Sequence, residues 1–252
     1  METQARRTSG ATPSPRRRAA ASADGSAPAP RPDRKLAILL AAERLFATRG
    51  YHAVSIRQIA DEAGVPLALV GYYYGQKHEL FHAIFARWAY TIDERIAALR
   101  VAEQLPHDAD KLRMIVHAFI DPVLRLRASA EGEYYALLIT VGLSMQQDLG
   151  VQDVIRDFFD PMARAFTNVL YETVREDAPG VTPATMAWCY QFALGALLHH
   201  ISDIRVDRLS GGVNRPNDPA AQPLLVDFIV HGIRGVVSQH CSAPRKTRRR
   251  PA

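Results

Sequence analysis

The stretch from Ser55 to Lys77, SIRQIADEAGVPLALVGYYYGQK, constrains the fold more than any other part of the chain. It contains two short segments in which apolar residues recur at helical spacing, and Gly64 lies between them. Glycine tolerates the left-handed backbone conformation that strains a residue with a Cβ, so Gly64 predicts a tight turn. Ser55 is a favourable N-cap, and Pro66 suits the first turn of the second helix because that turn needs no N–H donor. The stretch therefore predicts a helix, a turn and a second helix.

The spacing within this stretch agrees with a helix-turn-helix that enters a DNA groove. With Ile56 as the first position, Ala60 is the fifth residue, where the two helices touch, and Gly64 is the ninth. Val70 and Tyr73 fall at the fifteenth and eighteenth places, which are usual apolar anchors of the motif. The alternative is an ordinary helical hairpin inside a core. Agreement at so many places favours the DNA-binding motif.

The region from Asp33 to Leu80 resembles the N-terminal domain of TetR/AcrR-type regulators. It comprises a first helical segment, RKLAILLAAERLFATRGY, then the helix-turn-helix, then the run YYYGQKHEL that leads into a long fourth helix. The remaining residues resemble this family in length and helical pattern only. The resemblance implies an all-α homodimer, in which a three-helix DNA-binding domain is joined to a larger C-terminal helical domain. In such proteins the larger domain binds a small molecule and thereby controls the affinity for DNA.

Several residues of the motif are predicted to contact DNA. Arg57 is the candidate for the main base-edge contact, because the second helix exposes few hydrogen-bonding groups and offers mainly apolar contact with thymine methyls. Gly71 departs from the family pattern, which often has a bulky polar or aromatic residue there, and this puts sharp base recognition by the second helix in doubt. Tyr72, Lys77 and Ser55 are expected on phosphates. The full predicted set is Ser55, Arg57, Pro66, Leu67, Ala68, Gly71, Tyr72 and Lys77.

Composition and charge divide the chain into four regions. Residues 1–32 contain six arginines and hardly an apolar anchor, so a disordered basic tail is expected there. Residues 33–80 form the predicted DNA-binding domain, and residues 81–240 form the predicted ligand-binding and dimerisation domain, which is net acidic. Residues 241–252 form a second disordered basic tail. The two tails either follow DNA phosphates or the minor groove beside the site, or only keep the protein soluble.

Residues 81–240 carry helical periodicity throughout. One uninterrupted helix is expected from Glu79 to about Leu99, and another from about Gln152 to Glu176. The segment from Pro183 to about Val206 is apolar nearly all round, which predicts burial on both sides. The resemblance places the dimer interface on this segment and on the last one, Leu224 to Val237.

A ligand pocket in such a domain lies between helices and is lined by apolar and aromatic groups with a few polar ones. The effector is accordingly expected to be apolar or amphipathic. The candidate pocket residues are His117, Phe119, Tyr134, Met145, Phe158, Met162, Phe166, Trp188 and Phe192.

The run from His78 to His82 matches HExxH, a pattern in which two histidines on one helix face bind zinc and the glutamate acts as a base. A zinc hydrolase also needs a third protein ligand, and no GxxH follows at the spacing that metzincins use. Glu103, the nearest downstream acid at a plausible distance, precedes Pro106 in an expected loop. No G-x-S-x-G, Walker A or G-x-G-x-x-G pattern occurs. We therefore expect no catalytic residues, no metal site and no cofactor.

The sequence predicts a cytoplasmic, homodimeric transcriptional regulator, with repression favoured over activation. Two recognition helices are needed to read the half-sites of a palindromic operator, and an effector would release the protein from that DNA. An apolar h-region and a run of roughly 18 apolar residues are both lacking, which argues against secretion and membrane insertion. Two alternatives stay open: a zinc hydrolase built on the HExxH match, and an architectural DNA-binding protein without an effector. The poor base-reading surface and the basic tails favour the second of these.

Overall fold

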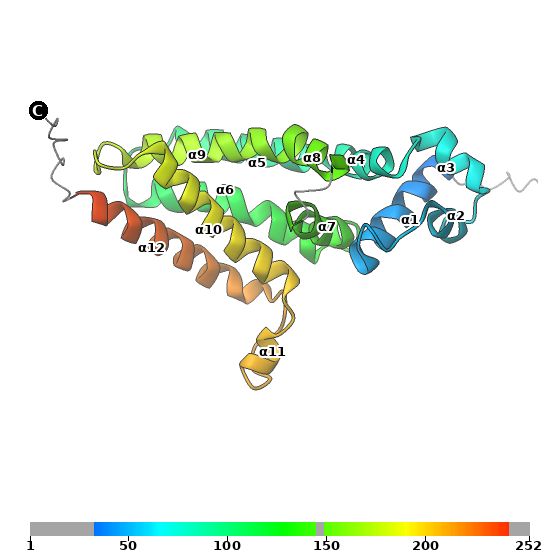
Figure 1. Cartoon of the computed structure of the whole chain (residues 1–252). Helices are drawn as coiled ribbons and strands as arrows, with labels where there is room; N and C mark the ends of the chain where they lie inside the picture. Colours follow the sequence, from blue (N-terminus) through cyan, green and yellow to red (C-terminus); the bar gives the residue numbers. More distant parts are fainter. Residues whose placement is uncertain (1–32, 145–148, 242–252) are drawn as a thin grey trace, which may run out of the picture. The chain divides into compact units, whose positions relative to one another are not determined.

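The computed structural model describes residues 33–144 and 149–241, and it contains only helices and connecting loops over those residues (Figure 1). The all-α prediction is confirmed. The two predicted basic tails, except Cys241, and the pocket candidate Met145 lie outside the described residues. The α-helices are α1 Arg34–Arg49, α2 Ile56–Glu62, α3 Leu67–Tyr74, α4 Lys77–Arg87, α5 Ala89–Glu103, α6 Ala109–Ala128, α7 Glu133–Ser144, α8 Leu149–Val154, α9 Asp160–Val174, α10 Pro183–Ser202, α11 Val206–Leu209 and α12 Gln222–Cys241.

Local chemistry accounts for the first three helices. The Asp33 carboxylate accepts hydrogen bonds from the backbone N–H of Lys35 at 3.0 Å and of Leu36 at 3.2 Å, which caps α1. The Ser55 hydroxyl accepts from the N–H of Gln58 at 3.3 Å, while the Gln58 side chain accepts from the N–H of Ser55 at 2.8 Å. This reciprocal capping box begins α2. Gly64 has φ of +64°, so the predicted left-handed turn between α2 and α3 is confirmed.

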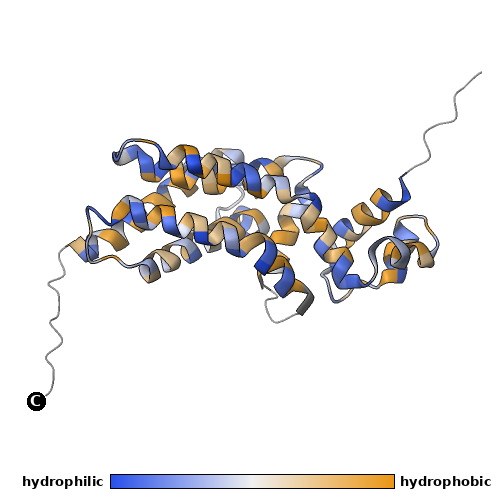
Figure 2. Cartoon of the chain, turned by 90° about the horizontal axis from the view of Figure 1, so that it is seen from above, coloured by the Kyte–Doolittle hydropathy of each residue, from blue (hydrophilic) through white to orange (hydrophobic). Residues whose placement is uncertain are grey.

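The larger part of the chain is a helical bundle. Helices α5, α6 and α9 pack against one another, and α10 packs against α9 and α12. Helix α7 contacts both α6 and α1, so a single set of buried apolar side chains runs from the helix-turn-helix into the bundle. Figure 2 shows polar and apolar residues side by side on the helices of this bundle, as amphipathic packing requires.

The expected uninterrupted helix from Glu79 to Leu99 is wrong, because the helix breaks at Trp88. The N–H of Trp88 bonds to the carbonyl of Phe85 at 3.1 Å, a tighter turn than an α-helix makes, and α5 begins at the next residue. The indole N–H of Trp88 donates to the buried Glu43 carboxylate of α1 at 3.2 Å. This tertiary contact holds the side chain where a straight helix would not place it.

The expected helix from Gln152 to Glu176 is also divided. A π-helical stretch, Ile155–Phe159, separates α8 from α9. The N–H of Asp160, which follows the stretch, bonds to the carbonyl of Ile155. The following residue is Pro161, which supplies no N–H donor, so the hydrogen-bond register shifts by one residue just before it.

Helix α10 does not have the expected burial on both sides. Trp188 and Phe192 are each 63% exposed, and Phe228 of the adjacent α12 is 73% exposed. The segment Pro219–Cys241 is long and apolar enough to cross a membrane by length and composition, although the sequence had suggested no such run. Since core helices of soluble proteins meet the same criterion, one such helix is weak evidence for a membrane span.

Candidate functional site

The predicted DNA-contacting residues lie at the exposed positions of α2 and α3. Arg57, Leu67, Ala68 and Gly71 are exposed, and Tyr72 is exposed over 79% of its surface. Ile59 and Val70, which face the other way, are fully buried. Ser55 is exposed as the cap of α2, and Pro66 is the N-cap of α3 instead of a residue in its first turn. DNA contact by all of these residues stays a prediction.

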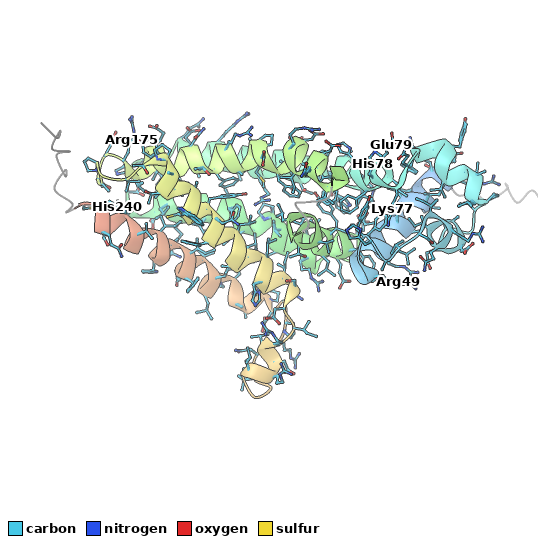
Figure 3. The ribbon with its side chains drawn as sticks, in the orientation of Figure 1. Arg49, Lys77, His78, Glu79, Arg175 and His240 are labelled. Atoms are coloured by element: carbon cyan, nitrogen blue, oxygen red, sulfur yellow. The ribbon has the colours of Figure 1, made fainter. Side chains whose placement is uncertain are left out.

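Lys77 is less available to a phosphate than the sequence suggested. Its side chain is half-buried, and its Nζ lies 4.4 Å from the ring centroid of Tyr51 and 5.8 Å from that of Phe46 (Figure 3). The ammonium group thereby stacks on aromatic faces at the beginning of α4. Its role as a phosphate contact stays a prediction.

Tyr74 fixes α3 against α1. Its hydroxyl donates to the carbonyl of Lys35 at 2.8 Å. Burial raises the pKa of the Tyr74 hydroxyl to about 12, and the negative charge of Asp33 adds to the effect. The hydroxyl therefore stays protonated, as a donor must, throughout the physiological pH range.

Glu79 and His82 of the HExxH match have structural partners. The Glu79 carboxylate accepts from the backbone N–H of Gln76 at 2.6 Å and so closes a capping box at the start of α4. His82 Nε2 lies 3.1 Å from an Asp157 carboxylate oxygen. Within the described ranges, no group of three or more His, Cys, Asp or Glu side chains is arranged to hold a metal ion. The motif begins α4 and ties it to the π-helical stretch.

The predicted pocket residues do not form a single site. Phe119 and Phe166 are buried in contact, with ring centroids 5.2 Å apart, and Met162 is buried one turn before Phe166. Phe158 is half-buried beside His82, at the junction of α4 with the π-helical stretch. These positions are compatible with an internal pocket, which stays a prediction.

Four other candidates lie elsewhere, and the fifth, Met145, lies outside the described residues. His117 pairs with Asp121 at 3.1 Å, and Tyr134 lines a cavity between α1 and α7. Trp188 and Phe192 are exposed and stack on one another with centroids 5.7 Å apart, and ligand contact by both stays a prediction. Their helix turns this side outward because its opposite side already packs on α9.

Sequence reasoning missed Arg95 of α5. The residue is only 4% exposed, and its Cζ lies 4.8 Å from the ring centroid of Phe119 and 5.9 Å from that of Phe166. Burial lowers the pKa of the guanidinium to about 10, so it keeps its charge at neutral pH. A signal was present, since Arg95 stands at helical spacing with the buried Leu99 and Ala102.

A second missed group joins the helix-turn-helix to the bundle. The buried Glu43 carboxylate of α1 accepts from Trp88 Nε1 at 3.2 Å and from Arg87 Nη1 at 3.3 Å. Desolvation raises the pKa of Glu43 even though both of these partners lower it. Trp88 in turn stacks on the buried Tyr135 of α7, with centroids 5.1 Å apart and planes 11° from parallel.

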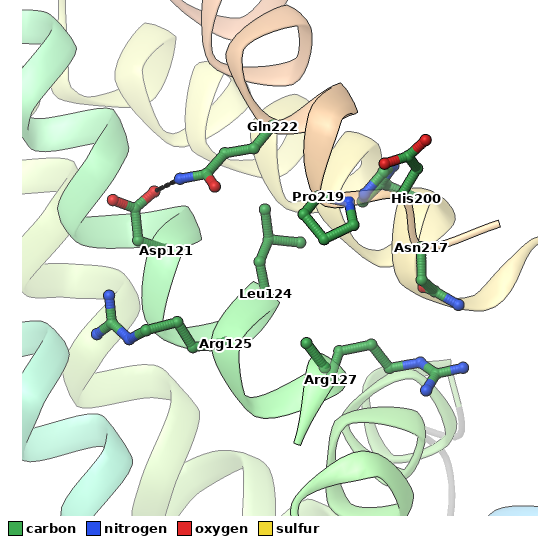
Figure 4. A pocket seen from close by; sticks show the side chains of 10 residues that line it. Asp121, Leu124, Arg125, Arg127, His200, Asn217, Pro219 and Gln222 are labelled. Carbon is green, nitrogen blue, oxygen red and sulfur yellow. Dashed lines mark hydrogen bonds between the residues drawn. The ribbon is translucent and has the colours of Figure 1, made fainter. Parts of the chain in front are cut away.

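A cavity with several charged side chains lies between α6, α10 and the start of α12 and has a volume of about 270 Å³ (Figure 4). Gln222 Nε2 donates to Asp121 Oδ1 across it at 2.7 Å. Arg125, Arg127 and His200 also line it, which differs from the apolar lining expected from the sequence. A more apolar cavity of about 310 Å³ lies between α10 and α12 and is lined in part by Phe192 and Phe228.

Two parts of the chain match family models. Residues 38–84 match the model described as bacterial regulatory proteins, tetR family, and residues 117–232 match the tetracyclin repressor-like C-terminal domain. The HTH-type transcriptional activator FasR of Mycolicibacterium smegmatis is 36% identical over 93 residues, which are 36% of this chain and 41% of that protein. The regulator HbdR of Aromatoleum sp. is 32% identical over 87 residues, 34% of this chain and 37% of that protein. The chain thus spans about two fifths of the length of these relatives.

Solved structures share the fold over most of the chain. The fatty acid degradation regulator FadR of Bacillus halodurans aligns with a TM-score of 0.55 at 16% identity, covering 82% of this chain and 99% of that one. The multidrug binding protein EbrR, in complex with malachite green, gives the same TM-score, identity and coverage. A TetR-family regulator of Mesorhizobium loti gives a TM-score of 0.52 at 15% identity, with coverage of 81% and 96%. The two family matches, together with the helix-turn-helix geometry and the shared fold, show that the chain belongs to the TetR family of transcriptional regulators.

Proposed function

We propose that this protein is a homodimeric repressor that binds a palindromic operator and is released from it by a small apolar or amphipathic effector. The observation that carries the proposal is the capped helix-turn-helix, whose outer side exposes Arg57, Leu67 and Tyr72 while its inner side is packed into the core. Nothing in the core explains exposed leucine and tyrosine on so short a helix, whereas base methyls and phosphates do.

Dimerisation is supported by the uncovered apolar side of α10 and α12. Trp188, Phe192 and Phe228 are exposed over most of their surfaces, and the cavity beside the last two is largely apolar. Contiguous apolar surface of this kind marks an interaction site in a soluble protein. A second copy of the chain would cover it, which also accounts for the small buried share, 22%, of the most apolar 18-residue window within Pro219–Cys241. We place this soluble dimer in the cytoplasm.

Activation is the second candidate, since the relative from Mycolicibacterium smegmatis carries the name of an activator. Repression and activation use the same DNA-binding surface, because the position of the operator relative to the promoter decides whether transcription falls or rises. Transcription from a promoter that carries the operator, measured with and without the protein, separates the two.

The DNA-binding part of the proposal is tested by selecting bound duplexes from a random pool and measuring the affinity of variants for the winner. Arg57→Ala is expected to lose about 1–3 kcal/mol of specific binding, as a base-edge contact should. Arg175→Ala is the matched control, because Arg175 pairs with Glu172 at the far end of the bundle from Arg49 and Lys77 (Figure 3). Equal affinity of the wild type for the selected and random duplexes would contradict an operator-specific regulator and favour an architectural protein.

A further inference from the structure

Arg95 is a buried cation without a counter-charge among the described residues. Its Nε and Nη2 are fully enclosed and find no hydrogen-bond acceptor within the described part of the chain. The guanidinium lies over the rings of Phe119 and Phe166, and Tyr190 packs on Phe119; we name these three residues the aromatic box. Phe119 contacts both other rings, with centroid distances of 5.2 Å to Phe166 and 5.4 Å to Tyr190.

Arginine is seldom enclosed in this way, because a buried guanidinium is normally paired with a carboxylate or with backbone carbonyls. The faces of Phe119 and Phe166 attract the positive charge from above the guanidinium plane. They offer nothing to the N–H groups, which point outward within that plane. The charge is thus partly stabilised, whereas the two donors are left unsatisfied.

The identity of the two unsatisfied nitrogens indicates the missing acceptor. Nε–H and one N–H of Nη2 lie side by side and parallel on one edge of the guanidinium, the fork that binds both oxygens of a carboxylate. One positive charge matches one negative charge, and a phosphate dianion would bring a second negative charge to a site where the described residues supply only the Arg95 cation. The aromatic walls favour an apolar group next to the anion.

We propose that the aromatic box is the effector site and that it binds a monoanionic carboxylate carried on an apolar body, with Nε and Nη2 of Arg95 donating to the two carboxylate oxygens. This inference rests on the proposed function for its regulatory meaning, but not for the binding itself. The box is closed in the structure, so a ligand has to displace one wall. Helix α6 is suited to that, because Pro122 leaves the Ala118 carbonyl, beside Phe119, without its helical donor.

The test compares matched pairs of ligands that differ only in the anion. Decanoate against decan-1-ol, and phenylacetate against 2-phenylethanol, are titrated by calorimetry at neutral pH into the full-length wild type, Arg95→Met and Arg100→Met. Arg100 is exposed on the same helix and serves as the charge-matched control. Decyl phosphate is a further arm that separates a carboxylate from a phosphate site. For the wild type and for Arg100→Met, we expect at least one carboxylate to bind at least tenfold more tightly than its matched alcohol. For Arg95→Met, we expect the acid and the alcohol to bind equally.

Three results would overturn the proposal: neither carboxylate binds, acid and alcohol bind equally to the wild type, or the preference survives in Arg95→Met. Tighter binding of decyl phosphate than of decanoate would overturn the choice of anion. If Arg95→Met does not fold, the ¹⁵Nε–H resonance of Arg95 in the wild type tests the same contact. The proposal requires that this resonance shifts when a carboxylate is added and does not shift when the matched alcohol is added. Operator affinity without ligand is measured separately, so a failure of DNA binding is distinguished from a failure of carboxylate binding.

Discussion

Replacing Arg95 by methionine should stabilise the ligand-free protein. The change removes two enclosed N–H donors that have no acceptor among the described residues, and each such donor costs about 1–3 kcal/mol. It also removes the attraction between the guanidinium and the rings of Phe119 and Phe166, which contributes about 0.5–2 kcal/mol. Methionine keeps an unbranched apolar stem and adapts to irregular space, so the cavity term is small. The two terms leave a gain of between about 0 and 5.5 kcal/mol. Replacing a buried ion pair by apolar residues of similar volume stabilises by about 1–4 kcal/mol, and we expect a gain of that order.

The gain is measured as the difference in free energy of unfolding from urea titrations at neutral pH. Protein concentration is held constant, because the stability of a dimer depends on it. A thermal scan should show the same order, with the midpoint rising by about 2–4 °C for each kcal/mol in a chain of this size. Arg100→Met makes the same chemical change at an exposed position of α5 and should stay within about 0.5 kcal/mol of the wild type.

Destabilisation of Arg95→Met, or a change no larger than that of Arg100→Met, would refute this reasoning. It would mean that the guanidinium is satisfied in solution, for example by an enclosed water molecule that accepts from both nitrogens. A gain in stability without ligand, together with a loss of carboxylate preference, would instead show that the chain keeps a destabilising group because binding requires it.

Three other perturbations test separate parts of the structure. Gly64→Ala should cost roughly 1–2 kcal/mol in urea unfolding, because φ at this residue is +64°, whereas Gly71→Ala in helix α3, where an added Cβ meets open space, should not destabilise. Phe228→Glu should convert dimers to monomers in sedimentation experiments without loss of helical circular dichroism, and an unchanged dimer would place the interface elsewhere. Burial raises the pKa of Glu43, so its neutral form is favoured in the folded state and wild-type stability should fall as pH rises through that raised pKa. Glu43→Gln should lack this fall, so its stability relative to the wild type should grow from acid to neutral pH in urea titrations, and a constant difference would contradict the assignment.

The helix-turn-helix was predictable because its determinants are local. The cap at Asp33, the capping box at Ser55 and the left-handed turn at Gly64 depend on residues no more than three positions away. The alternation of buried and exposed positions in α2 and α3 follows from helical spacing, which is why the sequence predicts that Arg57 and Tyr72 face outward. Such short-range features form independently of how the rest of the chain packs.

The features that sequence reasoning missed depend on residues far apart in the chain. Trp88 has a good helical context, and only its bond to Glu43, 45 residues earlier, explains why the helix breaks there. Arg95 stands in an apolar stripe, but whether an arginine there reaches solvent depends on how α6 and α9 cover it. Trp188 and Phe192 read as core from composition, whereas the described helices cover only the other side of α10. In each case tertiary packing decides what periodicity leaves open.

The same long-range contacts supply a physical route between the aromatic box and the DNA-binding helices. Burial raises the pKa of the Tyr135 hydroxyl, and Arg95 lies close enough for its charge to lower that pKa in part. Tyr135 stacks on Trp88, and Trp88 donates to Glu43 within α1. The route passes through the helix break between α4 and α5, where a small rotation of α5 changes the direction of the indole N–H. Because Glu43 is buried and desolvated, losing that donor is costly, so α1 should follow the movement of Trp88. Coupling then requires only that a carboxylate binds one orientation of α5 more tightly than the other, since that difference in affinity is the free energy available to change the spacing of the two recognition helices.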